Sequence, residues 1–248
     1  MLTSDPVYHA RGAALTAGYP ESVPVQCINR FCSSGLMATT TIANQIRTGQ
    51  IDIGLAVGIE SMSEKCVNVI VLFLIPVLIM TFSPDKGGPT QTAEIANNYP
   101  AKDCPKPMGW TSENVAIDFD VTREEMDDFA AQSYTKAEHA QKAGYFDREI
   151  VPFTAYKKNS LGVREKVTIS KDDGIRYGTV KESLSKIRAA FPQWGNASTT
   201  GGNASQITDG AAAVLLMSRR KAQELGLTIL AKFVTTAVTG NTFSLLHG

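Results

Sequence analysis

The chain contains 248 residues, and its content of 43% hydrophobic and 19% charged residues is that of an ordinary globular protein. Its 24 basic and 24 acidic residues balance, so the composition predicts neither a nucleic acid nor a membrane surface as a partner. The 4 cysteines have neither metal-ligand spacing nor the density of a disulfide scaffold, and there are only 3 histidines, so we expect no metal site and a reducing compartment.

The first elements expected along the chain are a helix and then a strand–helix–strand unit. Residues 7–17 are rich in alanine and are followed by Gly18, which predicts a helix closed by a glycine. Residues 23–28 have the composition of a buried strand, and a helix with apolar side chains at helical spacing follows from Cys32. A second short apolar run, residues 52–58, completes the unit. We therefore expect two parallel strands of a buried sheet, joined by a right-handed crossover.

Cys32 is the first candidate for a functional side chain, because it lies where the predicted helix begins. Unpaired backbone N–H groups and the positive end of the helix dipole favour a thiolate at such a position. The small neighbours Ser33, Ser34 and Gly35 leave room for a substrate. The alternative is a buried structural cysteine, which is the commoner role of a lone cysteine. Position alone leaves the two interpretations evenly matched.

The later part of the chain predicts further helices, a hairpin and another strand. Thr122 and Glu125 form a capping-box pattern that predicts a long helix over residues 123–143, with Phe129 and Ala130 on its apolar face. The other predicted elements are short helices over residues 91–99, 184–190 and 221–225, a helix opening at 111–114, a hairpin within 150–167 and a strand over 210–218. We expect that strand to join the sheet that holds the two earlier strands.

Four stretches, in order along the chain, match motifs of one enzyme family. They are residues 29–36 (NRFCSSGL), 58–63 (GIESMS), 107–116 (PMGWTSENVA) and 202–213 (GNASQITDGAAA). They resemble motifs of the thiolases, which cleave or form 3-ketoacyl-CoA, and the first is similar to the motif around the family's nucleophilic cysteine. Within the family, the residues of these four motifs are most similar to those of the peroxisomal-type 3-ketoacyl-CoA thiolases.

The resemblance implies an α/β fold, the layered αβαβα fold of thiolases. Residues 1–218 would be a partial N-terminal domain, with its loop region at about 64–205. Residues 219–248 would be a linker helix and the truncated start of the C-terminal domain, whose first strand residues 231–238 resemble. The chain would thus start part-way into the first domain of the family.

The resemblance also implies the chemistry and the residues that perform it. Cys32 would attack the ketone of 3-ketoacyl-CoA and carry the acyl group as a thioester, in the degradative direction of fatty acid β-oxidation. Met108 and Ser205, in the third and fourth motifs, would contact the substrate and its CoA moiety. Neither a metal nor a cofactor is implied, because coenzyme A is itself a substrate of the family.

Three further motifs of the family are absent from the printed sequence: a G-H-P histidine, a C-x-G-x-G cysteine and an N-E-A asparagine. The resemblance assigns them acid/base catalysis and part of an oxyanion hole. We therefore expect negligible turnover by this polypeptide alone. A non-catalytic polypeptide that binds acyl-CoA or oligomerises, and a biosynthetic acetoacetyl-CoA thiolase, remain alternatives to the degradative enzyme.

Residues 66–82 form the one membrane-like run of the sequence. The run is shorter than the roughly 20 residues that span a bilayer, and it contains Asn68 and Pro76. Related thiolases hold a short polar loop at this place, so the resemblance implies an insertion. We favour a translated intron or a gene-model error; a native core strand and a membrane anchor are the alternatives.

The assembly and the compartment also follow from the family. The resemblance implies a homodimer or homotetramer of the full-length protein, with acyl-CoA and CoA as its small-molecule partners. It implies the peroxisome, with the cytoplasm and the mitochondrion as alternatives. Neither end of the sequence shows a recognisable targeting signal: the first residues lack a signal-peptide pattern, and the last residues are not a peroxisomal targeting tripeptide.

Overall fold

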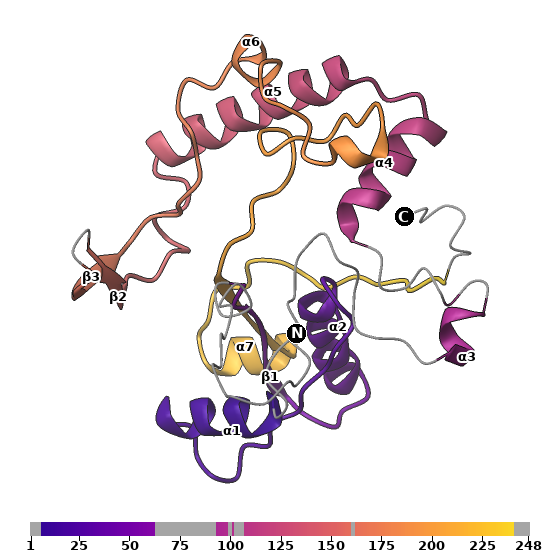
Figure 1. Ribbon diagram of the computed structural model, residues 1–248. Coiled ribbons are helices and arrows are strands. Elements are labelled where there is room, and N and C mark those ends of the chain that lie inside the picture. The colour runs from indigo at the N-terminus through magenta and orange to yellow at the C-terminus, as the bar shows by residue number, and fades with distance from the viewer. Residues whose placement is uncertain (1–5, 63–92, 99–100, 102–106, 160–161, 241–248) are drawn as a thin grey trace, which may run out of the picture. The chain divides into compact units, whose positions relative to one another are not determined.

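The structure, a computed structural model, describes residues 6–62, 93–98, 101, 107–159 and 162–240 (Figure 1). The chain divides into two units: the first comprises residues 1–82 and 207–240, and the second comprises residues 83–206 and 241–248. The apolar run predicted at 66–82 lies outside the described residues. Among the helices that are described, none is long and apolar enough to cross a membrane.

The first unit begins with the predicted helix, α1 (Pro6–Thr16), drawn in indigo in Figure 1. Gly18 follows it with φ +88°, and its N–H donates to the Leu15 carbonyl at 3.0 Å. The Tyr19 N–H donates to the Ala14 carbonyl at 3.1 Å, which completes a glycine-terminated helix end. Glycine adopts this left-handed backbone without a steric penalty, so Gly18 determines where the helix stops. The prediction of this helix is confirmed.

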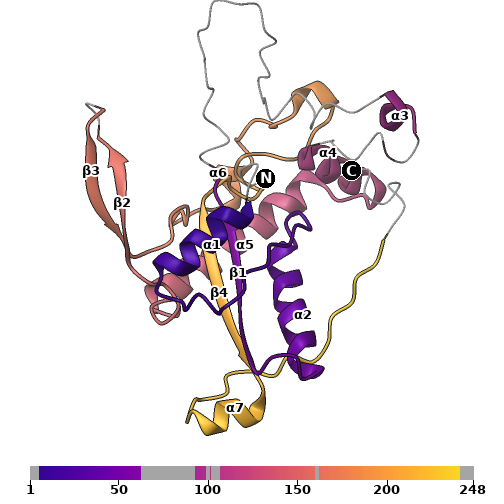
Figure 2. The same ribbon diagram turned by 90° about the horizontal axis from the view of Figure 1, so that it is seen from below.

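Helix α2 (Ser34–Arg47) lies beside strand β1 (Ile53–Glu60), as Figure 2 shows. The two elements approach closely because the strand presents small residues to the helix. Ala56 is buried, and a Cβ added at Gly58 would lie 3.6 Å from the Cα of Gly35. This close packing holds α2, and the turn that precedes it, against the strand.

Strand β1 pairs with β4 (Gly210–Met217) in an antiparallel two-stranded sheet. The expectation that the strand at 210–218 joins the strand after α2 is therefore confirmed, and α7 (Arg219–Glu224) follows close to its predicted place. The sheet is not buried as expected: among the described residues, α2 packs against both strands, yet most of the larger apolar side chains of the sheet are exposed. The apolar side chains of β1 that alternate with the small residues are 38–55% exposed: Ile53, Leu55, Val57 and Ile59.

Two predicted strands, residues 23–28 and 231–238, are not strands in the structure. Pro24 has no N–H to donate to a neighbouring strand, and the Val23 carbonyl accepts instead from the Arg11 guanidinium at 2.6 Å. In the later segment a carbonyl likewise accepts from a side chain of α2. The predicted parallel pair of residues 23–28 with 52–58 is therefore wrong. In the part of the chain described, β1 pairs with β4, and this pair is antiparallel.

The longest helix of the second unit is α5 (Arg123–Lys142), and it starts at the predicted capping box. The Thr122 N–H donates to Glu125 Oε2 at 2.8 Å, and the Glu125 N–H donates to Thr122 Oγ1 at 3.2 Å. The hydrogen bonds from Thr122, that of its backbone first, hold the pKa of Glu125 below its ordinary value of 4.5. Ala130 is buried as expected, but Phe129 is 74% exposed, so the predicted apolar face is wrong at that position.

The remaining elements of the second unit are short. They are helices α3 (Ala93–Ala96), α4 (Met108–Asp118) and α6 (Lys181–Leu184), a 3₁₀ turn at Pro192–Trp194, and the predicted hairpin of β2 (Phe153–Lys158) with β3 (Arg164–Ile169). The helix predicted over 184–190 is wrong, because α6 ends where it should begin. The Leu184 carbonyl accepts from the Ile187 N–H at 2.9 Å in a tight turn, and the Leu184 and Ile187 carbonyls also accept from Arg123 Nη2 at 2.9 and 2.8 Å.

Candidate functional site

Cys32 lies in a tight turn that ends in α2. The Phe31 N–H donates to Asn29 Oδ1 at 3.0 Å, and the Ser34 hydroxyl donates to the Phe31 carbonyl at 2.6 Å. These side-chain bonds hold Phe31 at φ +48°, a left-handed conformation that an aromatic residue seldom adopts. Cys32 follows directly and is an exposed, free thiol. The alternative of a buried structural cysteine is therefore wrong, while the role of Cys32 as a nucleophile stays a prediction.

The first turn of α2 is open to an anion. Ser33 occupies the N-cap position, but its hydroxyl donates to the Arg30 carbonyl at 2.9 Å and makes no cap bond to the helix. Two of the N–H groups at this end are used within the turn, since those of Ser33 and Ser34 donate to the Arg30 and Phe31 carbonyls, each at 3.1 Å. The positive end of the helix dipole remains beside Cys32. An oxyanion formed beside Cys32 would be stabilised there.

Met108 belongs to the second unit, where it is the first residue of α4 and 69% exposed. An aromatic cluster (Trp110, Phe191 and Trp194) lies beside the start of this helix. The Phe191 and Trp194 rings stack at 4.4 Å between centroids, and Trp110 meets Trp194 edge-on at 5.0 Å. Gly109 packs directly on the Phe191 ring, where a Cβ would overlap the ring atoms. This cluster fixes the helix end that presents Met108.

Ser205 is exposed, near the end of a loop that we call loop 198–206. The loop is fastened at its start by Glu113, a residue of α4 that is only 6% exposed. Its two carboxylate oxygens accept from the Ser198 N–H and the Thr199 N–H, each at 2.8 Å. Ser112 and Thr199 add a hydroxyl–hydroxyl bond of 2.8 Å. The two candidate CoA-contacting residues thus lie on a helix and a loop that are joined to each other.

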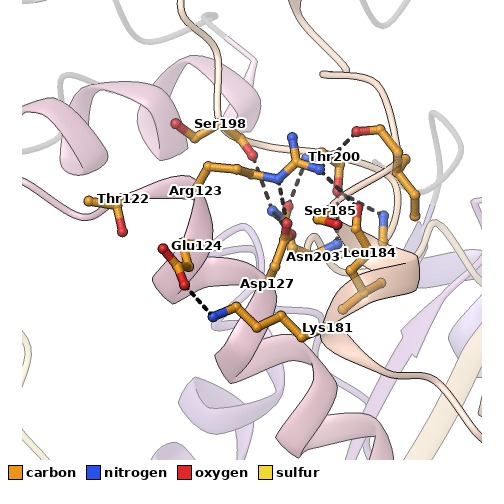
Figure 3. Close-up of polar contacts among 12 residues, drawn as sticks. Thr122, Arg123, Glu124, Asp127, Lys181, Leu184, Ser185, Ser198, Thr200 and Asn203 are labelled. Atoms are coloured by element: carbon orange, nitrogen blue, oxygen red, sulfur yellow. Dashed lines mark hydrogen bonds and ion pairs between the residues drawn. The ribbon is translucent and has the colours of Figure 1, made fainter.

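A second buried carboxylate, Asp127 on α5, fastens the middle of the same loop, as Figure 3 shows. Asp127 is 1% exposed; its Oδ2 accepts from Arg123 Nε at 2.7 Å and its Oδ1 from Asn203 Nδ2 at 3.0 Å. Asn203 also donates from Nδ2 to the Ser198 carbonyl at 3.1 Å and accepts from the Thr200 N–H at 2.7 Å. Every polar atom of the Asn203 side chain is therefore used to shape the loop.

An ion pair on the surface joins α5 to α6 beside this network (Figure 3). Lys181 Nζ donates to Glu124 Oε1 at 2.6 Å. This hydrogen bond is the main cause that lowers the pKa of Glu124 and raises the pKa of Lys181. Both side chains face water, so the pair adds little to stability and marks the outer edge of the network.

The structure leaves the predicted site residues in two places. Cys32 lies in the first unit, and Met108 and Ser205 lie in the second. Sequence reasoning assigned no role to Glu113 or Asn203, although both lie inside the motifs at 107–116 and 202–213. No local sequence pattern distinguished Asp127 as a buried residue, because it is one of several acidic residues on a polar helix. In the part of the chain described, no group of acidic, histidine or cysteine side chains could hold a metal ion.

The sequence profile of the thiolase N-terminal domain matches residues 4–220, most of the chain. The chain belongs to the thiolase family. The thiolase chain is 47% identical over 230 residues to a peroxisomal 3-ketoacyl-CoA thiolase of Yarrowia lipolytica, covering 93% of this chain and 51% of that protein. It is 44% identical over 232 residues to the peroxisomal 3-ketoacyl-CoA thiolase of Homo sapiens, covering 93% and 50%.

Solved thiolase structures agree with the fold. The crystal structure of the dimeric peroxisomal thiolase of Saccharomyces cerevisiae matches with a TM-score of 0.72 and 43% identity, over 89% of this chain and 50% of that one. The human mitochondrial 3-ketoacyl-CoA thiolase matches with a TM-score of 0.69 and 29% identity, over 91% and 54%. The α/β thiolase fold predicted from the four motifs is confirmed, and this thiolase chain spans about half the length of the relatives it matches.

Proposed function

We propose that this chain belongs to a degradative acyltransferase, which cleaves 3-ketoacyl-CoA to acetyl-CoA and a shortened acyl-CoA in fatty acid β-oxidation. The observation that carries the proposal is the exposed Cys32 thiol in the turn before the uncapped first turn of α2. The peroxisomal 3-ketoacyl-CoA thiolases to which the chain is 44–47% identical support this substrate class.

The proposed reaction has two steps, both at the Cys32 sulfur. In the first, the thiolate attacks the 3-keto carbon, the C2–C3 bond breaks, and the departing acetyl-CoA carbanion takes up a proton; the acyl group stays on Cys32 as a thioester. In the second, the CoA thiol attacks that thioester, loses its proton, and releases acyl-CoA and the Cys32 thiolate. The start of α2 lies next to the Cys32 sulfur, which is a thiolate before the first step and after the second and a neutral thioester between them.

Met108 and Ser205 are the residues that we propose to contact the CoA moiety. Met108 offers an exposed thioether at the start of α4, and Ser205 offers an exposed hydroxyl. The aromatic cluster and loop 198–206 hold these two side chains without a ligand. We propose no metal and no cofactor, because thiolate chemistry and CoA suffice for both steps.

A second candidate, a thiolase-like polypeptide that binds acyl-CoA without turnover, is favoured by one observation. The printed sequence contains no G-H-P, C-x-G-x-G or N-E-A motif, the family sources of acid/base catalysis and oxyanion binding. Removal of members of a catalytic unit typically lowers turnover by several orders of magnitude. The 248-residue polypeptide alone is therefore proposed to accept acyl groups on Cys32 with negligible turnover.

The assembly and the compartment are proposed from the relatives. The Saccharomyces cerevisiae enzyme is described as dimeric, which supports a homodimer, and a homotetramer is the alternative. The relatives named peroxisomal support the peroxisome, whereas the human mitochondrial relative keeps the mitochondrion as an alternative. The same relatives favour the degradative direction over acetoacetyl-CoA synthesis.

Acyl capture tests the proposed function. The purified chain is incubated with acetyl-CoA, and intact mass and peptide mapping locate any acetyl group; thioester exchange needs only the Cys32 thiolate and releases CoA. We expect one acetyl group on Cys32, none in Cys32→Ser, and an unchanged yield in the matched variant Cys27→Ser. An acetyl group that persists in Cys32→Ser, or its absence from a chain whose Cys32 still reacts with iodoacetamide, would overturn the proposal.

A further inference from the structure

Loop 198–206 is folded around its own side chains before it reaches Ser205. Thr200, which is 0% exposed, accepts at Oγ1 from the Gly202 N–H and the Asn203 N–H, each at 3.1 Å. A Cβ added at Gly202 would lie 2.5 Å from the Ile187 side chain, so the backbone is packed tightly at this point. The loop therefore has one defined shape through residue 203.

Asn203 connects this turn to the helix beneath it. Its amide oxygen fixes the Thr200 N–H, and its amide nitrogen bridges the Ser198 carbonyl and Asp127 Oδ1. Asp127 in turn is held by Arg123, whose guanidinium also binds the end of α6 (Figure 3). A charged acceptor gives the strongest of these hydrogen bonds, so Asp127 sets the orientation of the Asn203 amide.

Ser205 has no comparable support of its own. Its side chain is exposed, and its hydroxyl donates over a long 3.4 Å to the Gln206 carbonyl. Gln206 is tied to the backbone through a bond of 3.3 Å from its Nε2 to the Asp173 carbonyl. The chain before Ser205 is held by the Ala204 N–H, which donates to the Thr200 carbonyl at 3.1 Å, and by the Asn203 side chain, which fixes the Thr200 N–H and is itself held by Asp127.

We infer that Asn203, oriented by Asp127, is a positioning residue that holds Ser205 ready to contact CoA. This inference rests on the proposed function, because it assumes that loop 198–206 meets the CoA moiety. A preformed loop binds its ligand without first losing conformational entropy, whereas a loosened loop must be ordered at the time of binding. Asn203→Ala should therefore weaken CoA binding about tenfold, through Ser205.

A double-mutant cycle separates positioning from a general structural role. The dissociation constant for free CoA is measured by titration calorimetry on the 248-residue chain, Asn203→Ala, Ser205→Ala and the double variant. We expect the double variant to bind no more weakly than Ser205→Ala, because Asn203 acts through that hydroxyl. Additive losses, or unchanged affinity in Asn203→Ala, would overturn the inference while leaving the proposed function intact. If the unsubstituted chain fails to bind CoA, both fail together.

Exchanging the side chains of Asn203 and Asp127 provides a rescue experiment. A variant that had only lost its fold would not regain CoA affinity when the second substitution is added. Asn203→Asp places two carboxylates against each other and should weaken CoA binding, and adding Asp127→Asn restores one amide facing one carboxylate. We expect the double exchange to recover part of the affinity of the parent. The matched control is Glu124→Gln, the same chemical change on the same helix, which contacts Lys181 and not the loop. The inference would be contradicted if the double exchange and Asn203→Asp lost equal CoA affinity, or if Glu124→Gln also lost CoA affinity.

Discussion

The buried carboxylate of Glu113 allows a quantitative prediction about how the second unit is held together. The substitution Glu113→Gln changes one oxygen into an amide nitrogen with almost no change in shape. The glutamate accepts two backbone N–H groups, from Ser198 and Thr199. Glutamine can accept one of them, and its NH₂ group must then face the other donor, so one hydrogen bond is lost.

The structure indicates which bond is lost and at what cost. The bond from Thr199 is buried, whereas that from Ser198 is only partly buried. The glutamine oxygen should therefore turn to Thr199, and the Ser198 N–H keeps some access to water. Loss of one hydrogen bond to a charged acceptor, with partial compensation by water, destabilises the unit by about 2 kcal/mol.

Tryptophan fluorescence during urea unfolding measures this change. The chain has 2 tryptophans, and both Trp110 and Trp194 lie in the aromatic cluster of the second unit, so their signal reports the unfolding of this unit. The matched control is Asp118→Asn, the same carboxyl-to-amide change at an exposed position of the same helix, for which we expect a change within about 0.5 kcal/mol. If Glu113→Gln falls within that range at an unchanged m value, the assigned role of Glu113 is wrong.

Three further predictions follow from the described geometry. At neutral pH, iodoacetamide should modify the exposed Cys32 faster than the half-buried Cys27, as followed by peptide mass spectrometry. Gly109→Ala should destabilise the second unit by about 1–3 kcal/mol in urea unfolding, because the new methyl group overlaps the Phe191 ring. Because the pKa of Glu125 is lowered from 4.5 in the folded chain, its stabilising effect is complete above that pH and is lost as the pH falls through and below it, so the unfolding temperature should drop in acid.

Each of these predictions has a control. Urea should abolish the rate difference between the two cysteines, and equal rates in the folded chain would contradict the first prediction. Gly12→Ala, where a Cβ would meet no atom within 4 Å, should stabilise α1 by about 0.5–1 kcal/mol, so destabilisation by both alanines would contradict the second. Thr122→Ala removes the side-chain part of the capping box and should reduce the acid-dependent loss; an identical pH profile in this variant would refute the third.

Elements encoded by neighbouring residues could be predicted from the sequence. Gly18 marks the end of α1, and Thr122 with Glu125 marks the start of α5, because the groups that make the hydrogen bonds at a helix end lie within a few residues of one another. The hairpin of β2 and β3 was found for the same reason. The position of Cys32 before a helix was also predicted from local pattern, and its exposure agrees with a reactive role.

Predictions failed where an element depends on a distant partner. A strand exists only if another strand pairs with it, so residues 23–28 had the right composition and yet form none. The helix predicted over 184–190 is not formed: α6 ends at Leu184, whose carbonyl accepts from the Ile187 N–H and from the Arg123 guanidinium, 61 residues earlier in the chain. Asp127 could not be distinguished from its acidic neighbours until the structure showed it buried against Arg123 and Asn203.

The sequence by itself determined the family of this protein, its candidate nucleophile Cys32 and most helix ends, because motifs and caps are written in neighbouring residues. Only the tertiary structure decided which strands form, and which carboxylates hold the loop that carries Ser205. Glu113 reaches a backbone N–H 86 residues away, and Asp127 reaches a side chain 76 residues away. Contacts over such separations arise from the folded path of the chain, and no local pattern of residues records them.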